Sequence, residues 1–187
     1  MENPIPFVIL GGAVLLLLIF FIVQYNGLVA LRNHIKEAWS NIDTELKRRY
    51  ELIPNLVSAV KGYAKHEREV LESVVELRNR CIANEGAPTE QAIDESMLVE
   101  ELKRLLVVVE SYPELKANQN FLALQKELTN TENRIQAARR FYNGNVRDYR
   151  NKCETFPSSI VARMFRFESE DYFRVAPAVR EVPDVNL

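Results

Sequence analysis

The feature that most constrains this chain is an uncharged apolar run at residues 5–23, IPFVILGGAVLLLLIFFIV. It approaches the ~20 apolar residues that a helix needs to cross a bilayer. A cleaved signal peptide would carry a basic leader and a small-residue cleavage site, whereas MENPIP has no Lys or Arg and the flank QYNG is of another type. The run therefore predicts a retained transmembrane anchor over residues 5–24, after a short external segment at 1–4.

The charges that flank the anchor predict its orientation. No Lys or Arg precedes it, whereas Arg32 and Lys36 follow it closely. Cytoplasmic flanks of membrane spans carry an excess of Lys and Arg. We therefore expect a single-pass protein of the cell membrane, with its N-terminus outside and its folded part in the cytoplasm.

Composition narrows the class of the folded part. Six glycines among 187 residues, and few runs of alternating polarity, argue against a sheet protein. A formal net charge of −2 gives no basic excess, so no nucleic-acid partner is expected. The two cysteines, Cys81 and Cys153, lack metal-ligand spacing and are interpreted as reduced, buried thiols.

Apolar residues recur at three- and four-residue spacing along most of the chain, which predicts an all-α fold. The anchor should continue into a long antiparallel bundle at residues 25–165, followed by an extended C-terminal tail at 166–187. The bundle is predicted to contain three long helices and a short fourth. Their expected ranges are about 28–83, 89–112, 113–156 and 156–165.

A proline interrupts the first of these helices, in RRYELIPNLV. Pro54 removes a backbone donor and crowds the carbonyl of Tyr50, so Pro54 and Asn55 are predicted to form a kink that fits the helix to its bundle. The freed carbonyl of Tyr50 then needs a donor from another helix. The candidate donors are Asn133, Asn143 and Asn145.

Motifs that would carry chemistry are incomplete. His66 and Glu67 begin a zinc-protease helix motif, but Val70 occupies the position of its second histidine. His34 lies ~48 Å away along the predicted helix, so the two histidines cannot share an ion. There is no glycine-rich phosphate loop and no nucleophile with an evident base. We therefore predict no catalytic residue, no cofactor and no metal, and a protein that is not an enzyme.

A basic cluster, LKRRY at residues 46–50, admits two interpretations. It could bind anionic lipid or nucleic acid, but in an upright helix it would lie ~35 Å from the bilayer edge, several Debye lengths away. A solvated face, or an ion-pair partner for acidic residues of a neighbouring subunit, is favoured. Those acidic residues are Glu95, Glu100 and Glu101.

Two long stretches of the chain resemble the LemA family, a bacterial family. They are GLVALRNHIKEAWSNIDTELKRRYELIPNLVSAVKGYAKHE and YPELKANQNFLALQKELTNTENRIQAARRFYNGNVRDYRNKCETFPSSIVA. The resemblance extends over nearly all of the chain after the anchor. It implies an N-terminally anchored, mostly helical protein with a short external N-terminus, a long antiparallel bundle and no established enzymatic activity.

Two function classes remain. The first is a membrane-anchored scaffold that self-associates, favoured because a ~36 Å second helix cannot cover a ~65 Å third one. The second is a sensor or adaptor that presents a partner site at the bundle tip or tail. Expected partners are the lipid bilayer and further copies of the chain, with other membrane proteins as additional candidates. The tail valines expected to make oligomer or partner contacts are Val175, Val179, Val182 and Val185.

Overall fold

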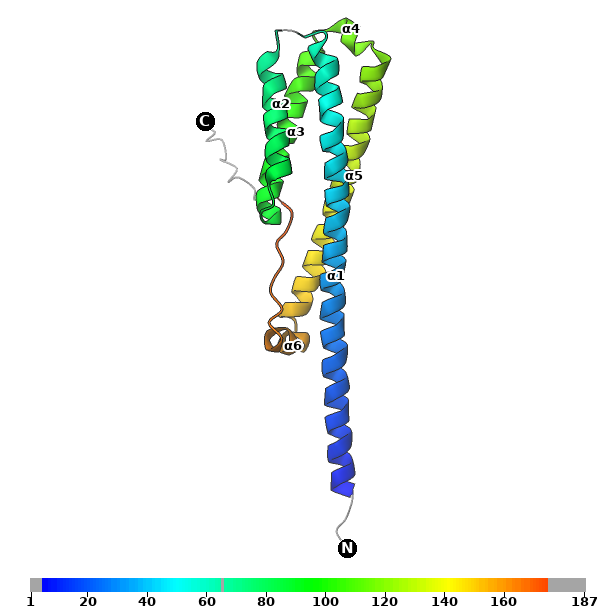
Figure 1. The fold of residues 1–187 in the computed structure, drawn as a ribbon. Helices are drawn as coiled ribbons and strands as arrows, with labels where there is room; N and C mark the ends of the chain where they lie inside the picture. Colours follow the sequence, from blue (N-terminus) through cyan, green and yellow to red (C-terminus); the bar gives the residue numbers. More distant parts are fainter. Residues whose placement is uncertain (1–4, 65, 175–187) are drawn as a thin grey trace, which may run out of the picture. The chain divides into compact units, whose positions relative to one another are not determined.

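The computed structural model describes residues 5–64 and 66–174, and every regular element in these ranges is a helix (Figure 1). The predicted all-α fold is thereby confirmed for the described residues. The helices are α1 (Ile5–Lys61), α2 (Arg68–Ala83), α3 (Pro88–Val109), α4 (Pro113–Lys116), α5 (Gln119–Glu154) and α6 (Ser158–Met164).

The chain divides into two compact units, which are considered separately. The first contains Met1–Ser40 and Phe141–Glu170, and the second contains Asn41–Arg140 and Asp171–Leu187. Helices α1 and α5 each contribute residues to both units.

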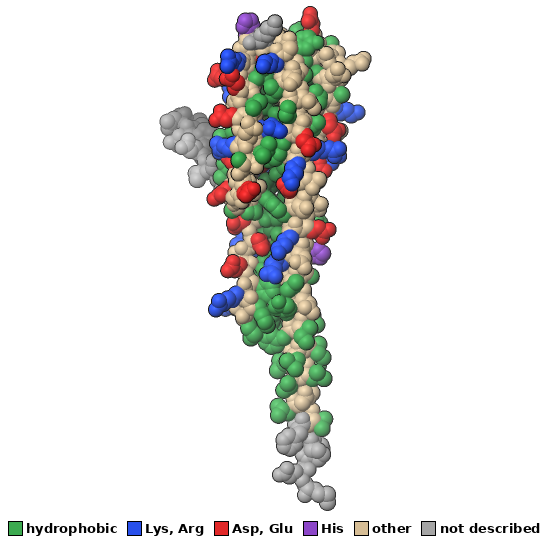
Figure 2. All heavy atoms as spheres, viewed as in Figure 1, with side chains coloured by type: hydrophobic (Ala, Val, Ile, Leu, Met, Phe, Trp, Pro, Cys, Tyr) green, Lys and Arg blue, Asp and Glu red, His purple; other side chains and the backbone are tan. Residues whose placement is uncertain are grey.

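The N-terminal part of α1 is apolar and uncovered. Its most apolar 18-residue window has a mean hydropathy of 2.6, and none of that window is buried. Among the described residues, α1 is the one helix that is long and apolar enough to cross a membrane, and it could serve as the anchor. Figure 2 shows hydrophobic side chains over this part of α1, without charges among them. The predicted long apolar N-terminal helix is therefore present.

The first unit has a core formed by α1, α5 and α6. The rings of Trp39 and Tyr142 pack with their centroids 5.4 Å apart, which joins α1 to α5. Other side chains of this core are buried at helical spacing on all three helices. They are Leu28, Ile35 and Ala38 on α1, Val146 and Tyr149 on α5, and Val161 and Ala162 on α6.

The prediction of one unbroken helix from 28 to 83 is wrong. Helix α1 ends at Lys61, and α2 begins at Arg68. Gly62, a poor helix former, follows the last residue of α1. The apolar spacing gave no sign of the break because Val60, just before it, and Ala64, within it, are both fully buried. A chain that turns while keeping the same residues in the core retains its helical periodicity.

The predicted third helix is also interrupted. Helix α4 ends at Lys116 and α5 begins at Gln119, with Asn118 between them. The side-chain Oδ1 of Asn118 accepts hydrogen bonds from the backbone N–H groups of Asn120 at 2.9 Å and Phe121 at 3.2 Å. Asparagine stabilises a helix start in this way, so the chain begins a new helix here.

The described tail residues after Glu170 belong to the second unit and pack on it. Phe173 is 1% exposed, and the guanidinium of Arg139 lies 5.1 Å from the centre of its ring. The hydroxyl of Thr89 donates to the carbonyl oxygen of Tyr172 at 3.2 Å. The four valines predicted to make contacts, Val175, Val179, Val182 and Val185, lie outside the described residues.

Candidate functional site: a buried ionic cluster and an apolar groove

The second unit contains a buried ionic cluster, composed of Arg49, Tyr50, Glu95 and Glu132. Arg49 of α1 is 1% exposed and forms ion pairs with Glu95 of α3 and with Glu132 of α5, the latter at 2.9 Å. The Tyr50 hydroxyl donates a hydrogen bond to Glu95. One guanidinium thus joins three helices that are far apart in the sequence.

Helical phase explains why Arg49 is buried. It shares a face of α1 with Leu46 and Ile53, both of which are core residues. On α3, Glu95 likewise lies between the buried Ala92 and Leu98 at three-residue spacing. A buried charge is tolerated where it is paired and hydrogen-bonded, and removal of one partner is costly. The cluster therefore fixes which faces of α1, α3 and α5 meet.

This arrangement corrects the interpretation of the basic cluster at 46–50. Arg49 pairs within its own chain and lies in the core, not on a solvated face or against a neighbouring subunit. Its neighbours Lys47 and Arg48 do lie on the surface, where they pair with Asp43 and Glu127.

The electrostatics of the cluster favour structure over reactivity. Burial is the main reason that the pKa of the Tyr50 phenol is raised, so this hydroxyl remains protonated and acts as a donor. An adjoining cavity of about 100 Å³ is lined by Arg49, Glu95, Glu132 and Phe173, among others. Ligand pockets usually have volumes of ~300–1,000 Å³, so this one is too small for an organic substrate.

The carbonyl freed by Pro54 has a partner on α2. Arg78 donates from Nε to the carbonyl oxygen of Tyr50 at 2.7 Å. Pro54 and Asn55 are themselves exposed and within α1. A donor was expected, but its identity was missed because no local pattern links Arg78 to a residue 28 positions earlier.

The three asparagines proposed as donors lie elsewhere. Asn145 donates to the carbonyl of Phe141 in its own helix at 2.9 Å, and Asn133 is exposed. Asn143 is half-buried, and the donor found at the carbonyl of Tyr50 is Arg78.

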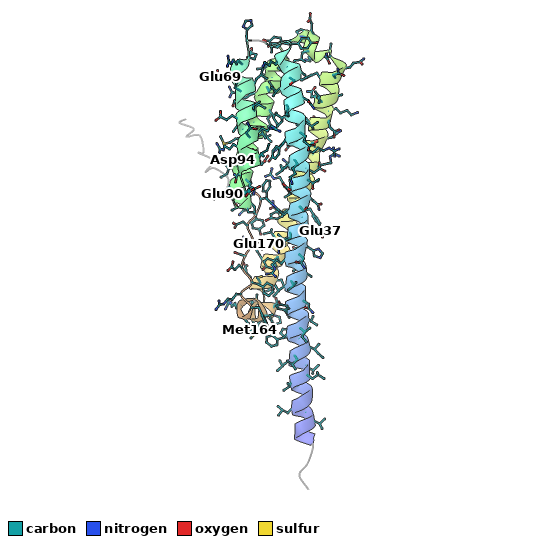
Figure 3. The ribbon with its side chains drawn as sticks, in the orientation of Figure 1. Glu37, Glu69, Glu90, Asp94, Met164 and Glu170 are labelled. Carbon is teal, nitrogen blue, oxygen red and sulfur yellow. The ribbon has the colours of Figure 1, made fainter. Side chains whose placement is uncertain are left out.

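A second ionic contact closes the α2–α3 hairpin. Asp94, labelled in Figure 3, forms an ion pair with Arg80 and accepts a hydrogen bond from Nδ2 of Asn84 at 2.7 Å. The hydrogen bond from Arg80 is the main reason that the pKa of Asp94 is lowered, and burial opposes it. This contact stabilises the turn that reverses the chain.

The groove of the second unit lies between the end of α1 and α2, and has a volume of about 930 Å³. Four apolar side chains line what we call the α1–α2 groove: Val57, Ala64, Leu71 and Val75. The rest of its lining is polar or charged, namely Lys61, Arg68, Glu72, Glu76 and Asn79. The apolar part of this lining suits the groove to binding an apolar surface.

The remaining candidate residues are dispersed. His34 and His66 are both exposed, and no group of three or more His, Cys, Asp or Glu side chains within the described ranges could hold a metal ion. Cys81 is buried, as predicted, and burial raises its pKa to about 11. Cys153 is only half-buried, in contrast to the prediction.

Comparison with known proteins places these features in a family context. The sequence profile described as "LemA family" matches residues 38–187. The chain is 26% identical over 171 residues to "Protein LemA" of Metamycoplasma hominis, covering 87% of this chain and 78% of that protein. It is 23% identical over 182 residues to "Magnetosome protein MamQ" of Magnetospirillum gryphiswaldense, covering 84% of this chain and 67% of that protein. "Magnetosome protein MamQ 2" of Paramagnetospirillum magneticum matches with the same identity and coverage.

Proposed function

We propose that this chain, which belongs to the LemA family, is a membrane-anchored, non-enzymatic scaffold that self-associates through its α1–α2 groove. The groove is the observation that carries the proposal. Its floor is apolar and open to solvent, and Val75 within it is 38% exposed. Helices with one apolar face dock into grooves of this kind.

The occupant we favour is a second copy of the chain. Ile82 lies seven residues after Val75 on α2 and is 48% exposed. Residues seven apart lie on nearly the same face of a helix, so the two extend the apolar floor of the groove along α2. A second copy that packs along this face would cover both side chains. Anchoring in one membrane would favour that contact, because it raises the effective concentration of the copies.

The anchor contributes a second surface for association. Apart from its chain neighbours and the nearby backbone of its own helix, a Cβ atom added at Gly11 or Gly12 would meet no atom within 4 Å, so the backbone there is open to a neighbour. Small residues in membrane helices permit close helix–helix approach. Gly11, Gly12 and Ala13 lack GxxxG spacing, so we assign them a supporting role.

We further propose that the N-terminus lies outside the cell and that the helical domain lies in the cytoplasm. Arg32 and Lys36 follow the apolar segment on α1, and no basic residue precedes it. This asymmetry supports the orientation.

An adaptor is the second candidate function, because the same groove would accept an amphipathic helix of another membrane protein. The charged residues of the α1–α2 groove favour this alternative. Lys61 and Arg68 are basic, whereas Glu72 and Glu76 are acidic, so an incoming helix with complementary charges would be oriented by the groove.

The experiment measures the mass of the detergent-extracted full chain by light scattering. The tested variant is Val75→Arg with Ile82→Arg, and the matched control is Val107→Arg, which changes a 69% exposed valine on α3. We expect a discrete oligomer for the natural chain and the control, and a smaller species for the groove variant. Helix content by circular dichroism verifies that each variant is folded. A natural chain that is monomeric and captures another membrane protein through the groove would favour the adaptor.

A further inference from the structure

Helix α6 presents apolar side chains on its outer surface. Ser158, Val161 and Ala162 are buried against the first unit. On the opposite side, Ile160 is 46% exposed, Met164 is 60% exposed, and Phe165 just after the helix is 51% exposed (Met164 is labelled in Figure 3). Ile160 and Met164 are four residues apart and therefore share a face. Exposed apolar patches of this kind usually mark a surface that contacts a partner or a membrane.

The patch adjoins the end of the apolar segment of α1. Phe165 packs against Tyr25 with ring centroids 4.8 Å apart, and Phe167 contacts the same ring at 5.6 Å. Tyr25 follows Val23, the last residue of the apolar run, by only two positions. Tyrosine is enriched where membrane helices leave the hydrocarbon for the headgroups. The contact therefore holds α6 at the level where α1 would leave the bilayer.

Polar groups surround this patch as they would at a lipid interface. Arg32 lies over the ring of Phe167 at 5.4 Å, and Lys152 occupies the space beside Gly27, where any Cβ would meet its side chain. Arg163 and Arg166 are exposed beside the apolar residues. Long basic side chains reach the headgroups from such positions while neighbouring apolar groups enter the acyl region.

We infer that Ile160, Met164 and Phe165 form an interfacial foot, which inserts into the headgroup–acyl boundary of the leaflet that the anchor crosses. The inference rests on the proposed anchoring of α1. It deepens that proposal because it assigns a second, non-spanning contact with lipid. The foot would fix the rotation and tilt of the first unit at the membrane surface, which a single spanning helix leaves free.

The net charge around the foot indicates whether lipid charge or apolar insertion attracts it to the membrane. Between residues 152 and 170 the basic residues are Lys152, Arg163 and Arg166, and the acidic ones are Glu154, Glu168 and Glu170. These two sets are equal in number, and Arg32 of α1 beside Phe167 adds one positive charge. A net charge this small leaves insertion of apolar side chains as the main attraction, so the foot should bind neutral lipid surfaces without a requirement for anionic lipid.

The test uses tryptophan fluorescence of the full chain in phosphatidylcholine vesicles whose acyl chains carry bromine, a contact quencher. Trp39 is the only natural tryptophan and lies ~21 Å beyond Tyr25 along α1, so its emission provides an unquenched baseline. Three single variants each add one tryptophan at an exposed apolar position. They are Leu16→Trp in the anchor, Met164→Trp in the foot and Val107→Trp as the matched control.

We expect the emission added by Leu16→Trp and Met164→Trp to be quenched and that added by Val107→Trp to persist. Quenching at Leu16 without quenching at Met164 would overturn the foot and leave the anchor intact. Quenching at neither site would overturn the anchor itself. Quenching at all three sites would also overturn the foot, because contact with the acyl chains would then not be specific to α6. Quenching at Met164 that requires anionic lipid would refute insertion by apolar side chains.

Discussion

Arg78 donates a hydrogen bond from Nε to the carbonyl oxygen of Tyr50, the carbonyl that Pro54 leaves without its helical donor. The long side chain of α2 replaces the missing backbone N–H of α1. A proline inside a helix is thus compensated by a specific partner on the neighbouring helix, which joins α1 to α2 near Pro54.

Replacement of Arg78 by Met should destabilise the fold by about 1–3 kcal/mol, the usual cost of an unsatisfied buried carbonyl. The same change in a Pro54→Ala chain should cost less, because residue 54 then supplies its own N–H to Tyr50. Urea unfolding followed by circular dichroism gives both values, and Arg68→Met, at an exposed position on α2, is the control. Equal costs in the two backgrounds would show that Arg78 acts independently of the proline.

Arg49→Met should be more damaging, at about 3–5 kcal/mol, because it leaves Glu95 in the core without its cation. The double variant Arg49→Met, Glu95→Met should recover much of this loss, since it removes both buried charges. Thermal unfolding of the single and double variants provides the comparison. Failure of the double variant to recover stability would mean that shape, not charge pairing, determines this contact.

Stability should fall in acid partly through Asp94. Its pKa is lowered in the folded chain, chiefly by the hydrogen bond from Arg80. A carboxyl group of this kind adds stability at pH values above its unfolded pKa of about 3.9, and that stability is lost as the pH falls through the folded value. Asp94→Asn should therefore be less stable at pH 7 and should lose less stability on acidification than the natural chain. Asp148→Asn, at an exposed position of α5, is the control for the loss of one carboxylate.

Orientation can be tested with thiol labelling of intact cells. Asn3→Cys should react with a membrane-impermeant maleimide, whereas Cys153, on the other side of the anchor in sequence, should react only after the cells are opened. Labelling of Cys153 alone in intact cells would reverse the proposed topology.

The fold could be predicted from the sequence where residues close in the chain determine the local structure, as prolines do at helix starts. Pro88 and Pro157 mark the starts of α3 and α6, and both helices lie within a few residues of their predicted ranges. The break after Lys61 was not predictable from periodicity, because Val60 before it and Ala64 within it are both in the core. Residue patterns in the sequence therefore predict where a helix begins better than they predict a turn whose residues stay buried.

The candidate site was harder to predict because its contacts are remote. An arginine within LKRRY resembles a surface residue until its partners are known, and those of Arg49 lie on α3 and α5. The need for a donor at Tyr50 was evident from Pro54, but nothing near either residue identifies Arg78. The groove depends on how α1 and α2 pack, which residue spacing alone does not determine.

The separation of Arg49 from Glu132 has a consequence for the newly made protein. The two residues are 83 positions apart, and ribosomes add about 5–20 residues per second, so Glu132 is made roughly 4–17 s after Arg49. The apolar segment of α1 is made before this interval begins and emerges from the ribosome ahead of α3 and α5, while the guanidinium that will join α1, α3 and α5 still lacks one of its carboxylates. Delivery to a membrane can thus precede closure of the helical domain, and the order of translation itself keeps the chain open until its last long helix has begun to emerge.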